Sequence, residues 1–407
     1  MKKSHKLIIA LALIGVVIMA VTIIRRHYSI KVNSIKIGVL HSLTGTMAVS
    51  ERPLLDAVRL AVEEINEQGG LLSQPLEVVA VDGMSDPEVF AAEAERLIEK
   101  EHVSVLFGCW TSACRKAVKP IVEKHRHLLF YPVQYEGMEQ SANILYSGAA
   151  PNQQIVPGTR WAMQKFGQRV YLVGSDYIFP RTANIIISDL INASEGEILG
   201  ERYQPLGSSD MEAIITDIAR KKPDVVLNTL NGDSNAAFFA ALVKAGLSDL
   251  PLVSFSVEEG GMLAWNGGQL TRHYGVWSYF QSLPGEENQR FVNAYRTRFG
   301  TDRVISDPVE AAYVGVKLWA QAVQDVESSE PSRVDPALLR QSIKSPSGIA
   351  AVDADTRHLW KMVRVGKVRP DGQFEQVFAS SAPLRPYPWP GYRTRDEWQV
   401  LLERDRP

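Results

Sequence analysis

Cysteine is nearly absent from this chain: Cys109 and Cys114 are the only two among 407 residues. We favour the interpretation that both are unpaired, small apolar residues at the end of a strand and the start of a helix. The alternative is a bridge formed in an oxidising compartment, which would close a very short loop and stabilise the fold little. No histidine or acid stands at ligand spacing from the pair, so a metal site is not expected there.

The sequence also lacks a strong charge imbalance and the motifs of common catalytic sites. The formal net charge is −2, so nothing draws the chain towards nucleic acid or anionic lipid. We find no G-x-S-x-G, H-E-x-x-H, phosphate-binding loop or G-x-G-x-x-G. An amidase would need a base beside its nucleophile, and His41 has no evident partner. These absences predict a protein that is not an enzyme and that uses no cofactor or metal.

The one long apolar run lies at the N-terminus. Three lysines precede residues Leu7 to Ile24, and two arginines follow them. A helix of that length spans about 27 Å, close to the roughly 30 Å hydrocarbon core of a bilayer. Cleaved signal peptides usually have a shorter apolar region and a small-x-small exit, whereas the candidate exit at residues 18–20 has a bulky residue where a small one is wanted. We therefore predict an uncleaved signal anchor over residues 1–30, with a cleaved signal as the alternative. The lysines favour a cytoplasmic N-terminus, which places the chain after the anchor outside the cytoplasm. A cleaved signal would also export the rest of the chain.

From Ile35 onward, predicted strands and helices alternate with short connections, which indicates parallel sheets covered by helices on both faces. The first run has strands at 35–40, 76–81, 103–107 and 128–131, with helices at 56–67, 87–99 and 113–124. The second has strands at 170–173, 197–203, 225–228 and 252–255, with helices at 153–165, 181–193, 211–220 and 235–245. Later elements are predicted at 276–280, 287–299, 308–326, 362–365 and 374–378.

The later elements lack partners of their own, which predicts that the chain returns to the first lobe. We expect lobe 1 to comprise residues 35–150 with 275–346, and lobe 2 residues 151–274 with 347–379, followed by a Pro-rich tail, 380–407. Ligands of open parallel sheets sit beyond the carboxyl ends of the strands. Two such lobes facing each other would place these loops across a cleft.

The loops at the predicted strand ends contain hydroxyls, aromatic rings, amides and a few acids, with almost no lysine. They are residues 41–46, 108–112, 131–137, 174–181, 228–235 and 254–260. Such a lining suits a small polar ligand that donates several hydrogen bonds.

Six segments carry a family resemblance: GCWTSACRKAV, LLFYPVQYEG, GAAPNQQIVP, YLVGSDYIFPRTAN, NTLNGDSNAAFF and SDPVEAAYVGVKLW. They resemble the substrate-binding proteins of urea-type ABC importers, within the broader amide- and branched-chain amino-acid-binding family. The resemblance extends from about residue 35 to about residue 378. It implies an α/β, type I periplasmic-binding-protein fold, with two doubly wound parallel-sheet lobes joined by three crossovers. It also implies delivery of the ligand to an ABC permease in the membrane.

The resemblance also implies which residues contact the ligand. In the first lobe they are Trp110, Thr111, Ser112, Gln134 and Tyr135, with Ser42 as a further candidate. In the second they are Tyr177, Asp233 and Glu258, with Glu259 as a substitute for Glu258. Urea offers four N–H donors and one carbonyl acceptor, and each buried group left unpaired costs about 1–3 kcal/mol. Carboxylates of the second lobe would accept from N–H groups, and a hydroxyl of Thr111 or Ser112 would donate to the carbonyl.

Structural roles remain open for the same residues. Thr111 and Ser112 suit the N-terminal cap of the following helix, and Asp233 suits a turn or cap. Trp110 could belong to the core, and Tyr177 to ordinary cleft packing.

The sequence departs from the family pattern in two places. Cys114 stands where a serine is expected, and the N-terminus offers an anchor where many relatives have a cleaved or lipidated signal. The anchor would hold an extracytoplasmic protein at the cytoplasmic membrane. It leaves open a sensor that signals amide or urea through hinge closure. An amino-acid carrier of the same fold is also open, although the loops show no clear clamp for a carboxylate.

Overall fold

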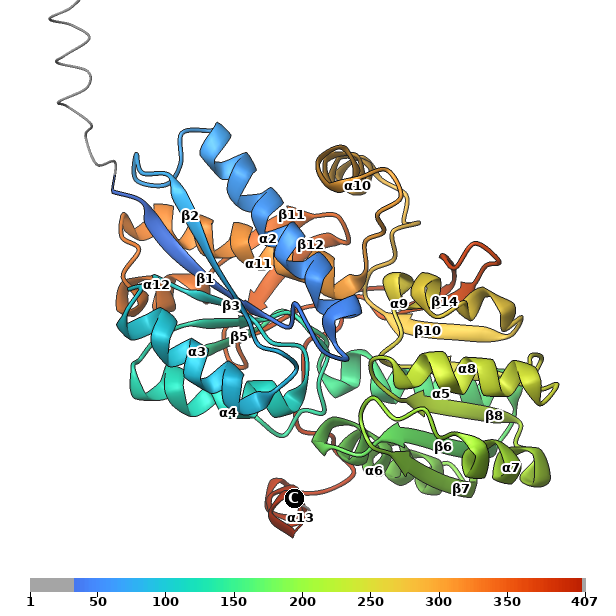
Figure 1. Ribbon diagram of the computed structural model, residues 1–407. Coiled ribbons are helices and arrows are strands. Elements are labelled where there is room, and N and C mark those ends of the chain that lie inside the picture. Colours follow the sequence, from blue (N-terminus) through green and yellow to red (C-terminus); the bar gives the residue numbers. More distant parts are fainter. Residues whose placement is uncertain (1–32, 405–407) are drawn as a thin grey trace, which may run out of the picture. The chain divides into compact units, whose positions relative to one another are not determined.

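The computed structural model describes residues 33–404, so the predicted signal anchor at residues 1–30 lies outside the described part of the chain. Among residues 33–404, no helix combines the length and the apolar character needed to cross a membrane. Residues 35–404 belong to one compact unit. Its secondary structure is organised around two sheets, which confirms the predicted α/β class (Figure 1).

The first sheet has eight strands in the order β11-β12-β13-β5-β4-β3-β1-β2. Its parallel strands are β1 (Ile35–His41), β2 (Leu76–Asp82), β3 (Leu106–Gly108), β4 (Leu129–Tyr131) and β5 (Ile144–Tyr146). Its later strands are β11 (Ser342–Ser345), β12 (Gly348–Asp353) and β13 (His358–Leu359). Its helices are α2 (Ala48–Glu67), α3 (Pro87–Glu99), α4 (Ser112–Lys124), α10 (Glu286–Phe299), α11 (Asp307–Val326) and α12 (Pro331–Leu338). Helix α2 packs on α11, and α3 packs on α4.

The second sheet has seven strands in the order β15-β14-β10-β9-β8-β6-β7. Its parallel strands are β6 (Arg169–Ser175), β7 (Glu197–Gln204), β8 (Val225–Thr229), β9 (Leu252–Ser254) and β10 (His273–Trp277). The antiparallel pair β14 (Arg364–Val368) and β15 (Phe374–Ala379) completes one edge. Its helices are α5 (Ile155–Phe166), α6 (Ile178–Ala193), α7 (Glu212–Lys221), α8 (Ser234–Lys244) and α9 (Glu259–Ala264), with 3-10 turns η1 (Pro151–Gln153) and η2 (Gly267–Gln269).

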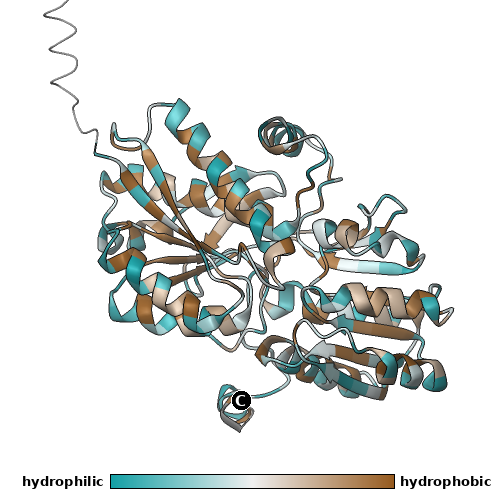
Figure 2. Cartoon of the chain, viewed as in Figure 1, coloured by the Kyte–Doolittle hydropathy of each residue, from teal (hydrophilic) through white to brown (hydrophobic). Residues whose placement is uncertain are grey.

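The inner strands are apolar because helices cover them. All residues of β8 and β10 are buried, as expected for parallel strands packed on two faces. In Figure 2 the inner strands are largely hydrophobic, whereas the helices alternate between hydrophobic and hydrophilic residues. Burial of these apolar faces is the main favourable contribution to the stability of each sheet.

The strand pairing differs from the expected domain boundaries in two places. Strand β10 belongs to the second sheet, so the chain returns to the first sheet only after Trp277 and not at residue 275. Strands β12 and β13 belong to the first sheet, although residues 347–379 were expected in lobe 2. The reason is local pairing: β12 folds back on β11, and β13 then extends the sheet beside β5. The chain therefore crosses between the sheets after β5, after β10 and after β13.

The C-terminal segment is more than a Pro-rich tail. Residues 380–404, which we call the C-terminal strap, end in helix α13 (Arg395–Arg404). Its Trp398 is fully buried and donates through its indole N–H to the Pro390 carbonyl, at 2.8 Å. The two guanidinium nitrogens of Arg393 contact the Asp189 carboxylate on α6 at 2.7 and 2.6 Å. The strap is thus packed against the second-sheet half of the body, which the sequence did not predict.

The two cysteines form a disulfide, with 5.7 Å between their Cα atoms. The favoured prediction that they are unpaired was therefore wrong. Cys109 follows β3 with a φ of +65°, a left-handed turn that brings the chain back towards the first turn of α4, where Cys114 lies. Both residues are buried. The bridge closes a short loop that contains Trp110, Thr111 and Ser112.

The bridge makes a testable contribution to stability. A loop this short is expected to contribute about 2 kcal/mol by restricting the unfolded chain. Cys114→Ser keeps the side-chain size nearly unchanged, so it should lower the melting temperature by a few degrees under oxidising conditions, as measured by calorimetry. Unfolding in the presence of a reductant should remove the difference. Equal melting temperatures of variant and parent without reductant would show that no stabilising bridge forms.

Candidate functional site

The loop after β3 is held by backbone and side-chain hydrogen bonds. The Thr111 hydroxyl accepts from the Cys114 backbone N–H at 3.1 Å and caps helix α4. Trp110 is buried, and its carbonyl accepts from the Tyr131 hydroxyl at 2.5 Å. The capping role considered for Thr111 is thus present, and the Trp110 backbone is fixed by a neighbouring strand.

Ser112 belongs to a buried network of charges around Arg115. The Ser112 hydroxyl donates to the Glu136 carboxylate and accepts from Arg115 Nη1 at 3.0 Å. Arg115 also donates to Glu136 Oε1 at 3.0 Å and to Glu139 Oε1 at 2.8 Å. Sequence reasoning missed Arg115, Glu136 and Glu139. The available signal was the arginine three residues after Ser112, one helical turn away, and two acids soon after Gln134.

Electrostatics keeps this network ionised. Burial raises the pKa of Glu139, but the charges of Arg115 and Lys116 outweigh it and lower that pKa to about 2. Burial alone would lower the pKa of Arg115, and the Glu139 and Glu136 carboxylates raise it well above its usual value. The guanidinium therefore remains a cation whose charge is shared between two acids.

Aromatic rings enclose the guanidinium. The centroids of the Tyr131 and Tyr135 rings lie 4.8 and 4.6 Å from Arg115 Cζ. Tyr135 also stacks on Tyr146 with 5.0 Å between centroids, and its hydroxyl lies 2.7 Å from His358 Nε2. Tyr135, a predicted contact, thus uses its polar atom within the first-sheet half. Tyr131 was not predicted, although it lies in the same quoted segment.

Gln134 lies between the two sheets. Its amide nitrogen donates to the Phe255 carbonyl at 2.9 Å and to the Ser256 hydroxyl at 3.0 Å, both after β9. Its side chain is buried, and its oxygen Oε1 has no hydrogen-bond partner among the described residues. A buried acceptor without a donor is unfavourable by about 1–3 kcal/mol, so this atom suits a ligand N–H.

Glu258 also connects the two halves. Its carboxylate caps α9, accepting from the N–H groups of Gly260 and Gly261 at 2.5 and 3.0 Å, and accepts from the Ser50 hydroxyl at 3.2 Å. Burial raises the pKa of Glu258, although these hydrogen bonds oppose the shift. In Glu259, one oxygen accepts from the Gln281 N–H at 3.0 Å, and Oε2 has no partner in the described part of the chain.

The remaining predicted residues differ in their surroundings. Asp233 is exposed, makes no side-chain cap bond, and donates through its backbone N–H to Thr46 Oγ1 at 3.4 Å. Ser42 is buried, and its hydroxyl accepts from the Ser85 N–H at 3.0 Å. Ser42 is thus tied to the loop after β2, and Asp233 marks a contact of the second-sheet half with the first.

Tyr177 precedes α6 and is partly buried. Burial raises the pKa of its hydroxyl well above the usual value, and the neighbouring Tyr131 and Glu136 raise it further. Tyr177 also lines one cavity with Lys116 and Glu139, so it lies beside the Arg115 network. The described contacts thus bring Trp110, Ser112 and Tyr177 into one group, and Glu258 with Ser50 into a second, with Gln134 spanning the two sheets.

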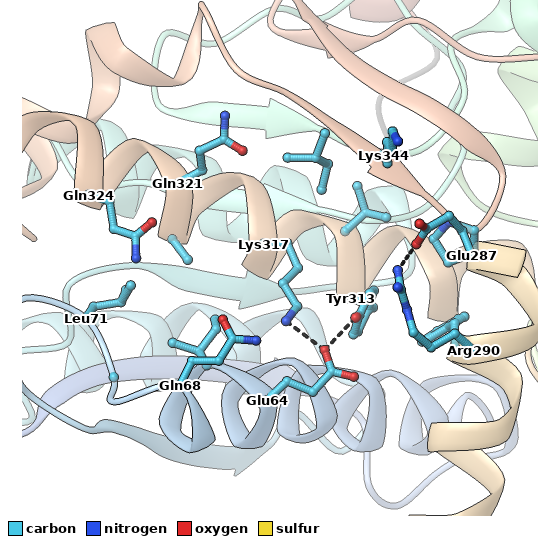
Figure 3. A pocket seen from close by; sticks show the side chains of 17 residues that line it. Glu64, Gln68, Leu71, Glu287, Arg290, Tyr313, Lys317, Gln321, Gln324 and Lys344 are labelled. Atoms are coloured by element: carbon cyan, nitrogen blue, oxygen red, sulfur yellow. Dashed lines mark hydrogen bonds and ion pairs between the residues drawn. The ribbon is translucent and has the colours of Figure 1, made fainter.

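A separate hollow of about 640 Å³ lies among α2, α10, α11 and β11. None of the predicted site residues lines it. Figure 3 shows that both of its acids have partners: Glu64 accepts from the Tyr313 hydroxyl at 2.6 Å and contacts Lys317 at 2.7 Å, and Glu287 contacts Arg290. The contacts of Glu64 join α2 to α11, whereas Glu287 and Arg290 both lie on α10.

Among the described residues, one group has the side chains to hold a metal ion. Ligand atoms of Glu95, Glu99 and His125 lie within 4.8 Å of one another. The Lys124 ammonium already contacts Glu95 at 2.6 Å, and these side chains are partly exposed, so we assign no metal to them.

Comparison with known proteins identifies the family. The model of the periplasmic binding protein domain family matches residues 35–395. The Leu/Ile/Val-binding protein homolog 8 of Brucella melitensis is 21% identical over 345 residues, covering 78% of this chain and 82% of that protein. A limonene hydroxylase of Geobacillus stearothermophilus is 35% identical, but this chain spans only 20% of its length, over 112 residues.

Solved structures share the fold. A solute-binding protein of an ABC transporter from R. palustris, in complex with benzoate, has a TM-score of 0.78 at 19% identity and covers 87% of this chain and 98% of its own. A branched-chain amino acid transporter substrate-binding protein from Streptococcus pneumoniae, in complex with isoleucine, has a TM-score of 0.75 at 20% identity, covering 87% and 100%. These two relatives are solute-binding proteins of transporters, which are not enzymes. This chain belongs to the periplasmic binding protein domain family.

Proposed function

We propose that this protein captures urea or a short-chain amide between its two halves for ABC-type import. The observation that carries the proposal is the buried Oε1 of Gln134, which lacks a donor among the described residues although Nε2 of the same side chain bonds to residues after β9. A ligand rich in N–H groups would satisfy this acceptor. The six sequence segments quoted above support the same ligand class.

The charges around Ser112 favour a neutral ligand over a carboxylate. Benzoate and isoleucine, the ligands of the related structures, both carry a carboxylate. A clamp for such a group needs a cation with free donors. The buried Arg115 instead points its Nε, Nη1 and Nη2 at Glu139, Ser112 and Glu136. These guanidinium donors are thus already committed within the protein, which is why we place amino acids second.

We further propose that residues 1–30 anchor the protein at the cytoplasmic membrane, with the body in the periplasm or an equivalent extracytoplasmic space. A tethered protein that changes shape on binding could also act as a sensor of amide or urea. Genes for a permease pair and ATPases beside this one would favour transport, and their absence would favour sensing.

The ligand is testable by calorimetric titration of residues 31–407 with urea, acetamide, formamide and leucine. We expect heat of binding with urea or the small amides, because each has N–H donors and no charge. Binding of leucine alone would contradict the proposed ligand class. Binding of none of the four would leave the amide assignment without support and would count against it.

Glu258 is proposed to accept an N–H of the ligand through its carboxylate. Glu258→Gln retains size and one acceptor oxygen but loses the charge, and we expect it to weaken urea binding at least tenfold, about 1.4 kcal/mol. The melting temperature should fall by only a few degrees. Ser50→Ala is the matched control, since it removes the 3.2 Å contact to Glu258 without changing the carboxylate. Urea affinity of Glu258→Gln equal to that of the parent would mean that the acceptor lies elsewhere.

The same assignment predicts a pH dependence. Burial raises the pKa of Glu258 above its usual value, so the carboxylate is the ionised acceptor only above that raised pKa and becomes protonated as pH falls through it. Urea affinity should therefore decline as the pH is lowered through the raised pKa of Glu258, as measured by titration at a series of pH values. The dependence should be reduced in Glu258→Gln. An unchanged profile in the variant would assign the titration to another group.

A further inference from the structure

A cavity of about 870 Å³ lies beside Tyr177 and is walled by three separate parts of the chain. Helix α4 contributes Lys116 and Lys119, the start of α6 contributes Tyr177, and the C-terminal strap contributes Trp389 and Arg395. Its size falls within the range of small-molecule sites. We infer that this cavity is a second ligand site, which takes a small apolar molecule bearing one carboxylate. The inference does not depend on urea being the ligand of the first site.

The acids that line this cavity are already neutralised. Glu139 contacts Arg115 at 2.8 Å and Lys116 at 3.3 Å. Asp176 contacts Arg181 at 2.6 Å. Each carboxylate thus has a close cationic partner within the protein and does not repel an incoming anion strongly.

Two cationic side chains that line the cavity have no close carboxylate partner among the described side chains. The Lys119 ammonium lies 3.9 Å from its nearest ion-pair partner, Glu123. Arg395 forms no ion pair among residues 33–404, and its guanidinium lies 4.5 Å from the centroid of the Trp389 ring. A guanidinium stacked on an aromatic ring keeps its edge donors free for a carboxylate, which it binds in a bidentate manner. These two side chains define the anionic end of the ligand.

The other lining residues define an apolar end. Met138, Ile178 and Leu402 line the cavity together with the rings of Tyr177 and Trp389. The indole N–H of Trp389 is among the buried donors without an acceptor in the described part of the chain. Apolar walls with a few polar groups are typical of sites for small organic ligands. An aryl or arylalkyl carboxylate has this combination of one charge and one flat apolar body.

The walls explain how such a ligand would affect the first site. Helix α4 flanks the first sheet, α6 flanks the second, and Tyr177 belongs to this cavity as well as to the group around Ser112. An occupant that contacts both halves binds one arrangement of them better than others. By linkage, binding of this ligand must then change the affinity for urea, and urea must change the affinity for this ligand by the same factor.

The test uses phenylacetate and its neutral isostere phenylacetamide, titrated by calorimetry into the full-length protein in detergent, with and without saturating urea. We expect phenylacetate to bind one site in both conditions, and phenylacetamide to bind at least tenfold more weakly. Arg395→Gln should weaken phenylacetate at least fivefold while urea affinity stays within twofold. Arg369→Gln, an exposed arginine paired with Asp371 in the β14–β15 hairpin, is the matched control and should change neither.

Three results would overturn the inference. They are no binding of phenylacetate, equal binding of the amide, and a phenylacetate affinity unaffected by Arg395→Gln. If urea displaced phenylacetate completely and Arg395→Gln did not change this competition, phenylacetate would bind at the first site and not in the cavity. Failure of urea to bind would count against the proposed function only. The affinity for phenylacetate would still test the second site, because phenylacetate is also titrated without urea.

Discussion

The buried guanidinium of Arg115 is the interaction on which the site depends. Removing a cation from water costs several kcal/mol unless it is paired and hydrogen-bonded. Here Glu136, Glu139 and Ser112 surround it, and the rings of Tyr131 and Tyr135 lie over it. The pairing ties the first turn of α4 to the loop after β4. The positions of Trp110 and Ser112 therefore follow from the stability of one charge network and not from the ligand alone.

Much of the fold could be predicted from the sequence because parallel strands and amphipathic helices have strong, distinct patterns. The strand Val225–Thr229 begins with an apolar run, Val225–Leu227, and helices such as Asp307–Val326 show an apolar stripe. The place of strand β13 was missed because it depends on a pairing partner distant in sequence. Strand β13 has only two residues, and its place is set by a bridge between His358 and Tyr146.

The site was predictable at the level of loops but less so at the level of atoms. The rule that ligands bind beyond parallel strands selected Trp110, Ser112 and Tyr177, which follow β3 and β6, and their contact with the ligand stays a prediction. It could not show that Tyr135 bonds within its own half or that Thr111 caps a helix, since both depend on side-chain orientation. Nor could spacing alone decide the state of Cys109 and Cys114. That outcome depends on the left-handed backbone at Cys109, an uncommon conformation for a residue other than glycine.

The C-terminal strap has a consequence for how the two halves can move. Arg385 contacts Asp353 of β12 at 2.7 Å, and Arg393 contacts Asp189 of α6 at 2.7 Å. The intervening stretch contains three prolines, which favour a stiff, extended chain of about 3 Å per residue. A short inextensible link between two bodies lets them swing apart only on the side away from it.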